Sequence, residues 1–201
     1  MIPKPKIVNS SKQGKLLATY KSCKEERLHS LTLGPDMESF ITADESRVDL
    51  WNIEKTKDEV YNLVDYERRN PVASDERVMC AEFNKSSGFT FLYTTSKGKI
   101  NICDLRESSD FHSRPSLQLQ VNEKLGAFHW LNDSASCVSD AKFVPFSHYV
   151  ASRDYMCVKL WDLRYASGIV PSKTLPVYSA QVTDYMERNL SPLHESDSLD
   201  D

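Results

Sequence analysis

The chain of 201 residues holds side chains that could support nucleophilic or metal chemistry, but their spacing builds no recognisable site. The five cysteines, none of them in a Cys-x-x-Cys pair, are Cys23, Cys80, Cys103, Cys137 and Cys157. The five histidines, equally scattered, are His29, His112, His129, His148 and His194. Composition alone permits a catalytic triad, but the phosphate-loop, dinucleotide, nucleophile-elbow and zinc-protease motifs do not occur. We therefore expect a protein that is not an enzyme and that uses no metal and no cofactor.

The charge pattern argues against nucleic acids and membranes as partners. The net charge is -4, although residues 1–27 carry seven Lys or Arg against two Glu. The basic segment has no interleaved aromatic residues, and the acidic remainder would repel phosphates. No run of eighteen apolar residues occurs, and Met1–Lys6 lacks the apolar segment of a secretory signal. Together with the odd number of cysteines, this pattern predicts a location in the cytosol, with the nucleus as a second compartment.

Three segments of the chain are similar to one another. They span residues 29–53, 78–105 and 137–163, and each alternates apolar and polar residues as strand, turn, strand, turn and strand. The third strand is clearest in each segment: Val48–Trp51, Ile100–Cys103 and Val158–Trp161. An Asn or Asp and then an Ile or Leu follow every one of these strands. Such an internal repeat indicates an architecture built from equivalent sheets.

The spacing of the repeats predicts an all-β fold, a WD-repeat β-propeller. The anchor positions Trp51, Cys103 and Trp161 are farther apart than the usual repeat of about 40–45 residues, which leaves room for a fourth strand and an insertion. Candidates for that strand are residues 61–66, 117–121 and 175–178. We expect a basic segment over residues 1–26, poorly matched to the repeats. Residues 27–201 then form three to four blades, with repeats near 29–66, 77–121 and 136–182.

The repeat also assigns structural roles to its most prominent residues. Trp51 and Trp161 are expected in the core between blades, with Cys103 as a small hydrophobic substitute. Asp44 and Asp154 each precede the anchor tryptophan by seven residues, where an aspartate typically caps a turn. Three blades would leave two apolar flanks uncovered, because blades bury their faces only against neighbouring blades. The sequence therefore indicates either a fragment of a longer propeller, which is the favoured interpretation, or a chain whose flanks a partner covers.

Three stretches of the sequence resemble the WD-repeat regulatory B subunit of protein phosphatase 2A. They are Phe91–Ser108, Val138–Leu163 and Ile41–Glu67, which contain Ser-Lys-Gly, Arg-Asp-Tyr and Asn-Leu-Val-Asp respectively. The resemblance implies a presumed seven-bladed propeller without catalysis of its own. It also implies docking on the phosphatase scaffold (A) subunit and recruitment of phosphoprotein substrates to the catalytic (C) subunit. The alternatives are a generic WD-repeat interaction scaffold, or a truncated product without function, neither linked to the phosphatase.

The same resemblance assigns residues to two contact regions. A hairpin over Ile100–Val121 would grip the scaffold subunit through Asp104, Arg106, Phe111, His112 and Arg114. It departs from the family at residues 113–116, where Ser-Arg-Pro-Ser replaces an acidic stretch. Substrates would be recruited by Asp154 and Tyr155 in a groove, and by Leu190 on the apolar stripe of a helix over residues 181–190. From the residues alone, the alternatives are an ordinary surface hairpin, a turn-capping aspartate and a core leucine.

Overall fold

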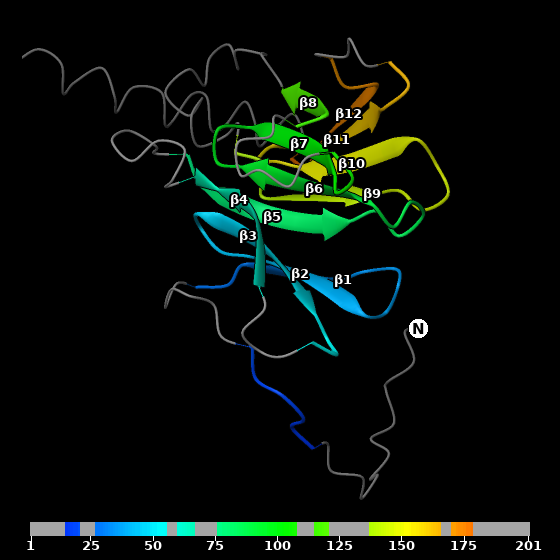
Figure 1. The fold of residues 1–201 in the computed structure, drawn as a ribbon. Helices are drawn as coiled ribbons and strands as arrows, with labels where there is room; N and C mark the ends of the chain where they lie inside the picture. Colours follow the sequence, from blue (N-terminus) through cyan, green and yellow to red (C-terminus); the bar gives the residue numbers. More distant parts are fainter. Residues whose placement is uncertain are drawn as a thin grey trace, which may run out of the picture.

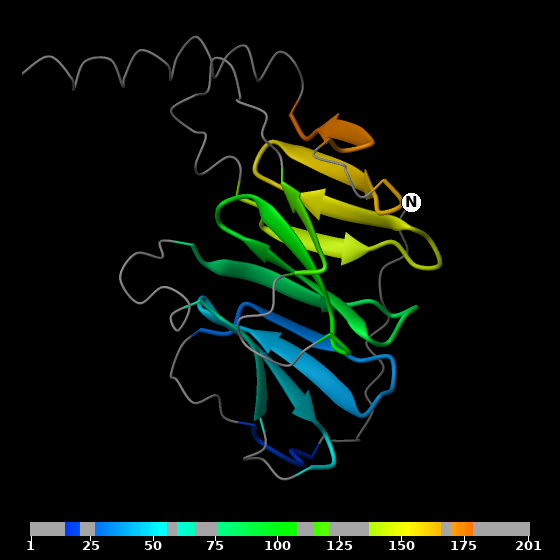
Figure 2. The ribbon, with the colours of Figure 1, turned by 45° about the horizontal axis from the view of Figure 1, so that its top comes forward.

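The computed structural model describes the protein as three four-stranded antiparallel sheets that follow one another along the chain (Figure 1). The described residues are 15–20, 27–55, 60–66, 76–107, 115–120, 137–165 and 170–178. Within this part of the chain, no helix is long and apolar enough to cross a membrane. The sheets stack with the second between the first and the third (Figure 2). Each sheet is a blade, and we number the blades 1 to 3 in chain order.

The strands of each blade run in sequence order across the sheet. Blade 1 consists of β1 (Ser30–Leu33), β2 (Ser39–Ala43), β3 (Arg47–Asn52) and β4 (Val60–Asp65). Blade 2 consists of β5 (Val78–Phe83), β6 (Thr90–Thr95), β7 (Lys99–Asp104) and β8 (Leu117–Gln120). Blade 3 consists of β9 (Asp140–Phe143), β10 (Tyr149–Arg153), β11 (Cys157–Asp162) and β12 (Lys173–Pro176). These sheets confirm the predicted all-β fold of partial propeller type.

The fourth strand of blade 3 lies two residues earlier than the sequence predicts. β12 runs from Lys173 to Pro176, whereas the sequence pattern predicts residues 175–178. All four residues of β12 are exposed, so Lys173 and Thr174 carry no hydrophobic signal. Their pairing with Leu160 and Lys159 on β11 places them in the strand. The prediction was therefore wrong about where this strand begins. It relied on apolar residues to mark the strand, but β12 is an exposed edge strand in which no apolar residue is buried.

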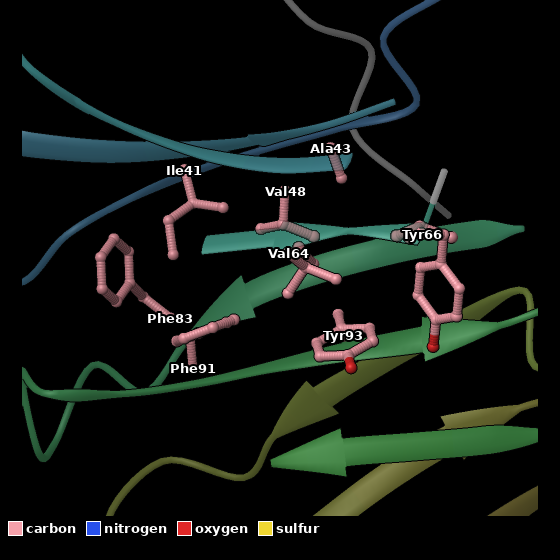
Figure 3. Close-up of a cluster of buried hydrophobic side chains, with 10 residues drawn as sticks. Ile41, Ala43, Val48, Val64, Tyr66, Phe83, Phe91 and Tyr93 are labelled. Atoms are coloured by element: carbon pink, nitrogen blue, oxygen red, sulfur yellow. The ribbon is translucent and has the colours of Figure 1, made fainter. Parts of the chain in front are cut away.

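The hydrophobic core lies between neighbouring blades. Between blades 1 and 2, the aliphatic residues of β2, β3 and β4 meet the aromatic residues of β5 and β6, as Figure 3 shows for Ile41, Val48, Val64, Phe83 and Phe91. A second cluster joins blades 2 and 3, where Trp161, Val150 and their neighbours meet Leu92, Ile100, Ile102 and Leu119. Burying these side chains removes apolar surface worth about 1.5–3 kcal/mol for each large residue. Contact between blades is therefore the main stabilising interaction.

The two tryptophan anchors are buried and hydrogen-bonded inside their blades. Trp51 is 3% exposed and Trp161 is 2% exposed, so both are buried. Trp161 lies between blades 2 and 3 as predicted, whereas Trp51 packs against Phe40 and Tyr20 on the outer flank of blade 1 and not between two described blades. The indole Nε1–H of Trp51 donates to Thr42 Oγ1 at 2.8 Å, and that of Trp161 donates to Ser152 Oγ at 2.9 Å. In both blades the acceptor lies on the adjacent second strand. Each bond satisfies a polar group that would otherwise be buried without a partner.

Blade 2 has side chains of different sizes at the positions that Thr42 and Trp51 occupy in blade 1. Strand register places Cys103 opposite Phe91, as Trp51 is opposite Phe40, and it places Tyr93 where blade 1 has Thr42. A large residue on the second strand therefore accompanies a small one on the third. Tyr93 is 1% exposed, and its ring packs edge-on against Tyr66 of blade 1 with centroids 6.3 Å apart. This exchange keeps the core filled without a tryptophan, since volume-conserving changes are the ones that cores tolerate best.

The two outward-facing flanks of the stack are incompletely covered. Leu31, Leu33 and Ile53 of blade 1 are 64%, 58% and 45% exposed, while the register equivalents of the two leucines in blade 2, Ala81 and Phe83, are each 1% exposed. Residues 15–20 cover part of this flank, and Tyr20 packs edge-on against the Phe40 and Trp51 rings. A cavity of about 330 Å³, lined mainly by apolar residues, remains between this segment and blade 1.

The flank of blade 3 is open in the same way. Val158 and Leu175 are 36% and 48% exposed, whereas their register equivalents in blade 2, Ile100 and Leu119, are 0% and 3% exposed. In blade 2 these positions are buried because blade 3 packs on them. Both flanks therefore have the residue pattern of blade interfaces, and each is suited to a further blade.

The indole hydrogen bonds generate a first prediction. Thr42→Val should destabilise the chain by about 1–3 kcal/mol, because it leaves the Trp51 Nε1–H buried without an acceptor. Thr94→Val is the matched control: Thr94 is 0% exposed and its Oγ1 has no hydrogen-bond partner. The control should be neutral or stabilising, since it removes an unsatisfied polar atom at constant shape. Urea unfolding of both variants measures the difference, and equal losses would show that the indole bond contributes nothing.

The buried carboxylate of Asp49 generates a second prediction. Burial raises the pKa of Asp49, the neighbouring Asp44 charge adds to the shift, and a 2.8 Å hydrogen bond donated by Asn62 Nδ2 opposes it. In blade 2 the same cross-strand position holds a neutral pair, Gln118 donating to Asn101. Asp49→Asn should therefore stabilise the chain by about 1 kcal/mol at neutral pH, because it keeps the acceptor and supplies a donor for Asn62 Oδ1, which is buried without a partner.

The pH dependence of this effect has a defined sign. A folded-state pKa above the unfolded value means that the contribution of Asp49 is fully present below the unfolded pKa. It is lost as the pH rises through the folded pKa. The advantage of Asp49→Asn over the wild type should therefore shrink as the pH falls from neutral toward the carboxyl range. Unfolding free energies measured across this range provide the test, and an advantage that grows on acidification would contradict it.

Candidate protein-interaction surfaces

The base of the predicted scaffold-binding hairpin is a rigid turn at the end of β7. Asp104 Oδ1 accepts the backbone N–H of Arg106 at 2.9 Å, and the Arg106 guanidinium donates back to the same carboxylate, with Nη2 2.6 Å from Oδ2. These bonds lower the pKa of Asp104 to about 2. The guanidinium also lies 5.1 Å from the Phe89 ring centroid. Asp104 and Arg106 are therefore hydrogen-bonded to each other, and the turn that they form fixes the direction in which the chain leaves β7.

The same turn recurs in blade 3. Asp162 accepts the backbone N–H of Arg164 at 3.1 Å, and Arg164 Nη2 donates to Asp162 Oδ2 at 2.6 Å. These side-chain bonds lower the pKa of Asp162 to about 2. In blade 1, Asn52 takes this position and accepts the backbone N–H groups of Glu54 and Lys55. Because the arrangement is repeated, Asp104 and Arg106 are part of a general blade turn and do not by themselves distinguish blade 2.

The insertion in blade 2 is closed at its base by one hydrogen bond. Ser116 Oγ donates to Glu107 Oε2 at 2.6 Å, which joins the two ends of the segment between β7 and β8. Nothing in the sequence pattern predicts this bond, although both residues flank the predicted contact residues. Phe111, His112 and Arg114 lie outside the described residues, as do Leu190 and the predicted helix over residues 181–190. The structure therefore establishes the two ends of the hairpin, and its tip stays a prediction.

Asp154 caps the turn between β10 and β11 in blade 3. Its Oδ1 accepts the backbone N–H groups of Met156 at 2.8 Å and Cys157 at 2.6 Å. Its Oδ2 accepts a hydrogen bond from Lys159 Nζ at 2.6 Å, and Asp154 is only 7% exposed. Asp44 caps the equivalent turn of blade 1, where Oδ1 accepts from Ser46 and Arg47. The turn-capping interpretation therefore accounts for the contacts of Oδ1, while Oδ2 pairs with Lys159. The predicted role of Asp154 toward substrates stays a prediction.

Tyr155 is the exposed side chain of the same turn. It is 57% exposed, and its ring lies 6.4 Å from that of Tyr178, at an interplanar angle of 46°. Met156 O accepts the backbone N–H of Val177 at 2.8 Å, which holds the segment carrying Tyr178 beside the turn. Sequence reasoning identified Tyr155 but missed Tyr178, because a contact between residues on different strand ends has no local signal. The exposed ring of Tyr155 and the half-buried ring of Tyr178 form an aromatic pair that a binding partner could contact.

The described residues contain no group of three or more His, Cys, Asp or Glu side chains arranged to hold a metal ion. Four of the five scattered cysteines lie in the described part of the chain, and no disulfide joins any two of these four. Burial raises the pKa of Cys80, and its Sγ–H donates to Asp140 Oδ1 at 3.1 Å. A raised pKa makes a thiol a weak nucleophile at neutral pH. The geometry of these residues is therefore that of structural side chains.

Comparison with solved structures shows the fold. The chain is similar to a structure of U3-55K, with a TM-score of 0.54, and to the WD40 repeats of RRP9, with a TM-score of 0.55. Each match has 15% sequence identity and covers 77% of this chain and 40% of the other. At this identity the likeness extends to the fold alone, and it confirms a partial WD-repeat propeller. No protein-family model matches the chain.

Comparison with curated proteins shows a closer relationship. The chain is 34% identical over 184 residues to the alpha isoform of the 55 kDa regulatory B subunit of serine/threonine protein phosphatase 2A from Oryza sativa subsp. japonica. It is 32% identical over 194 residues to the alpha isoform from Arabidopsis thaliana. These alignments cover 90% and 96% of the chain, but it spans only about a third of the length of these relatives, 30% and 36%. Over nine-tenths of its length, the chain is therefore homologous to one part of the 55 kDa regulatory B subunit of protein phosphatase 2A, which confirms the resemblance seen in the sequence.

Proposed function

We propose that the chain provides three blades of a non-catalytic regulatory B subunit of protein phosphatase 2A. In this role it docks on the scaffold (A) subunit and brings phosphoprotein substrates to the catalytic (C) subunit, in the cytosol and the nucleus. The observation that carries the proposal is the homology over 90% of the chain to proteins named as this regulatory component. The two open flanks support it, because they have the residue pattern of blade interfaces and suit a larger propeller.

In the proposed scaffold contact, the described and undescribed parts of the hairpin have different roles. Asp104 and Arg106 satisfy each other, so their task is to orient the hairpin where it leaves β7. The contact itself is assigned to Phe111, His112 and Arg114, an apolar anchor flanked by side chains that donate hydrogen bonds. Such a combination suits an interface core with a polar rim. The Glu107–Ser116 hydrogen bond keeps the two ends together and limits the entropy lost when the hairpin binds.

In the proposed substrate contact, Tyr155 contributes more to the binding affinity than Asp154 does. Lys159 neutralises the Asp154 carboxylate, and Asp154 is 7% exposed, so little negative potential is directed outward. The exposed ring of Tyr155, beside Tyr178, offers apolar area and a π-face to a basic substrate segment. The recruitment proposed here therefore combines an aromatic contact with a weak electrostatic one.

A third prediction tests the scaffold contact. Replacing residues 108–115 with a short Gly-Asn turn, which retains Glu107 and Ser116, should lower the affinity for the scaffold protein about ten-fold or more. The matched control shortens residues 166–169, the segment that follows the equivalent Asp-Leu-Arg turn of blade 3, and should bind normally. Titration of the immobilised scaffold protein with each variant measures the affinities, and circular dichroism checks the β-sheet content. Equal affinity of the hairpin variant and the wild type would remove the hairpin from the interface.

A fourth prediction separates the turn cap from substrate recruitment. Tyr155→Ala should weaken binding of a basic substrate peptide several-fold, since it removes the exposed ring, with little change in melting temperature. Asp154→Asn preserves a cap and leaves the Lys159 charge without its carboxylate partner, so we expect a smaller loss of binding that fades with added salt. Asp44→Asn changes the equivalent cap of blade 1 and serves as the control for stability. Fluorescence anisotropy with a labelled peptide is the measurement, and unchanged binding by Tyr155→Ala would refute the assignment.

A further inference from the structure

The turns between the second and third strands present a different kind of side chain at the same position in each blade. Glu45, Lys97 and Tyr155 are equivalent, since each lies three residues before the first residue of the third strand that pairs with the second. The three turns lie on one side of the stack in both views (Figures 1 and 2). In blade 2 this is the end of the sheet opposite to Asp104, where the hairpin leaves β7. An acidic, a basic and an aromatic side chain therefore occupy equivalent positions on this side.

The positive charge of Lys97 is not neutralised by any described residue. In blades 1 and 3 an aspartate caps the equivalent turn, whereas blade 2 has the neutral Ser96 there. Two ion pairs of 3.0 Å occupy the acidic residues described beside this turn, Arg77–Glu45 and Lys99–Glu76. Lys97 itself is exposed, and it has neither a hydrogen-bond partner nor an ion-pair partner in the part of the chain that the structure describes.

A second exposed cation lies beside this turn, at the end of β10. The Nε–H of Arg153 donates to Ser139 Oγ, a neutral acceptor, at 3.2 Å. The Ser139 backbone N–H donates to Arg153 O at 2.9 Å, and that of Val138 donates to Thr95 O at 3.4 Å. Because Thr95 ends β6 directly before the turn that carries Lys97, one short segment joins the two cations. We call Lys97 and Arg153 the basic pair.

The acidic residue opposite Arg153 on β9 is bound elsewhere. Asp140 accepts a hydrogen bond from the Cys80 thiol at 3.1 Å and lies 3.6 Å from Lys142 Nζ. Arg153 has no ion-pair partner among the described residues. The basic pair therefore creates a local excess of positive charge on a chain whose net charge is -4. Such an excess attracts carboxylates and phosphates, which a guanidinium can bind through two parallel hydrogen bonds.

The basic pair adjoins the aromatic pair of blade 3. Arg153 and Tyr155 are two residues apart, on either side of the Asp154 cap. Tyr155 and Tyr178 suit a cationic side chain, whereas the basic pair suits an anionic one. A segment that makes both contacts must therefore have both signs of charge. A uniformly basic segment is disfavoured, because its cations would meet like charges at the basic pair.

This surface suits a peptide better than a nucleic acid. A groove for a nucleic acid follows the phosphate backbone with a continuous row of basic residues. Here the carboxylates of Glu45 and Asp140 lie beside the two cations and interrupt such a row. A single anionic side chain can contact the basic pair without meeting these carboxylates.

We propose that the basic pair binds an anionic side chain, a carboxylate or a phosphate, on the same substrate segment whose basic residue contacts Tyr155. The inference rests on the proposed function, because the segment belongs to the phosphoproteins that the chain recruits. It deepens that function by naming the substrate class: segments of mixed charge are preferred over uniformly basic ones.

Three labelled peptides that share one Arg and differ at a second position test the assignment. That position holds Glu, phosphoserine or Gln. The full chain should bind the Glu peptide about three-fold, and the phosphoserine peptide up to about ten-fold, more tightly than the Gln peptide. Fluorescence anisotropy is the measurement, and the preference should shrink as salt is added, because the contact is exposed. A preference for both anions identifies a general carboxylate and phosphate contact, and a preference for phosphoserine alone identifies phosphate as the ligand.

Substitutions assign this preference to residues. Lys97→Gln and Arg153→Gln should each reduce it, and Lys97→Gln should leave the melting temperature unchanged, because Lys97 has no contact to lose. Lys85→Gln is the matched control, since Lys85 is an exposed lysine in the turn between β5 and β6, at the opposite end of blade 2. Lys97→Glu should bind a peptide with Lys at the second position more tightly than the wild type does. A purely structural role of Lys97 would not produce that gain.

The outcomes distinguish this inference from the proposed function. If the wild type binds none of the peptides, substrate recruitment fails and the assignment of the basic pair fails with it. If the wild type binds the Glu, phosphoserine and Gln peptides equally well, recruitment stands and only the basic pair is overturned. Binding of an oligouridine to the wild type, lost in Lys97→Gln, would also overturn the assignment and identify a nucleic acid as the partner.

Discussion

A four-stranded antiparallel sheet with two apolar faces is stable only when both faces are covered, and this constraint governs the rest of the structure. Blade 2 meets it fully: one face packs on blade 1 through Phe83, Phe91 and Tyr93, and the other packs on blade 3 through Leu92 and Ile100. Blades 1 and 3 each meet it on one side. The exposure of Leu31 and Leu175 shows where the stack would continue. Burial between blades, and not hydrogen bonding within them, sets which parts of the chain depend on neighbours.

The same constraint explains where interaction surfaces are found. Once the faces of the sheets are committed to each other, only strand edges and turns remain available for partners. The hairpin base at Asp104 and Arg106 and the aromatic pair Tyr155 and Tyr178 both lie at such turns. The rigid blades hold these turns in place through capping bonds such as those of Asp154 and Asp162. In the described part of the chain, the surfaces left for partners are therefore turns held in fixed positions.

Much of the fold could be predicted from the sequence, because alternation of apolar residues reports directly on burial in sheets. The third strands, the buried tryptophans and the open flanks were all predicted correctly from spacing and pattern. β12 was placed wrongly because an exposed edge strand has no such alternation. The candidate sites were harder. The partnership of Asp154 with Lys159 depends on a turn that brings the two side chains together, and the pattern of apolar residues does not report it.

The hydrogen bond between Glu107 and Ser116 has a consequence for how the chain can vary. The bond joins the two ends of the insertion at 2.6 Å, next to the paired strands β7 and β8. Each doubling of a flexible loop adds only about 0.6 kcal/mol of closure entropy. Insertions and deletions at this point are therefore cheap for the fold, and natural variation can lengthen, shorten or exchange the segment while β7 and β8 stay paired. The segment between β7 and β8 is thus a position in blade 2 at which binding specificity can change during evolution while the sheet stays folded.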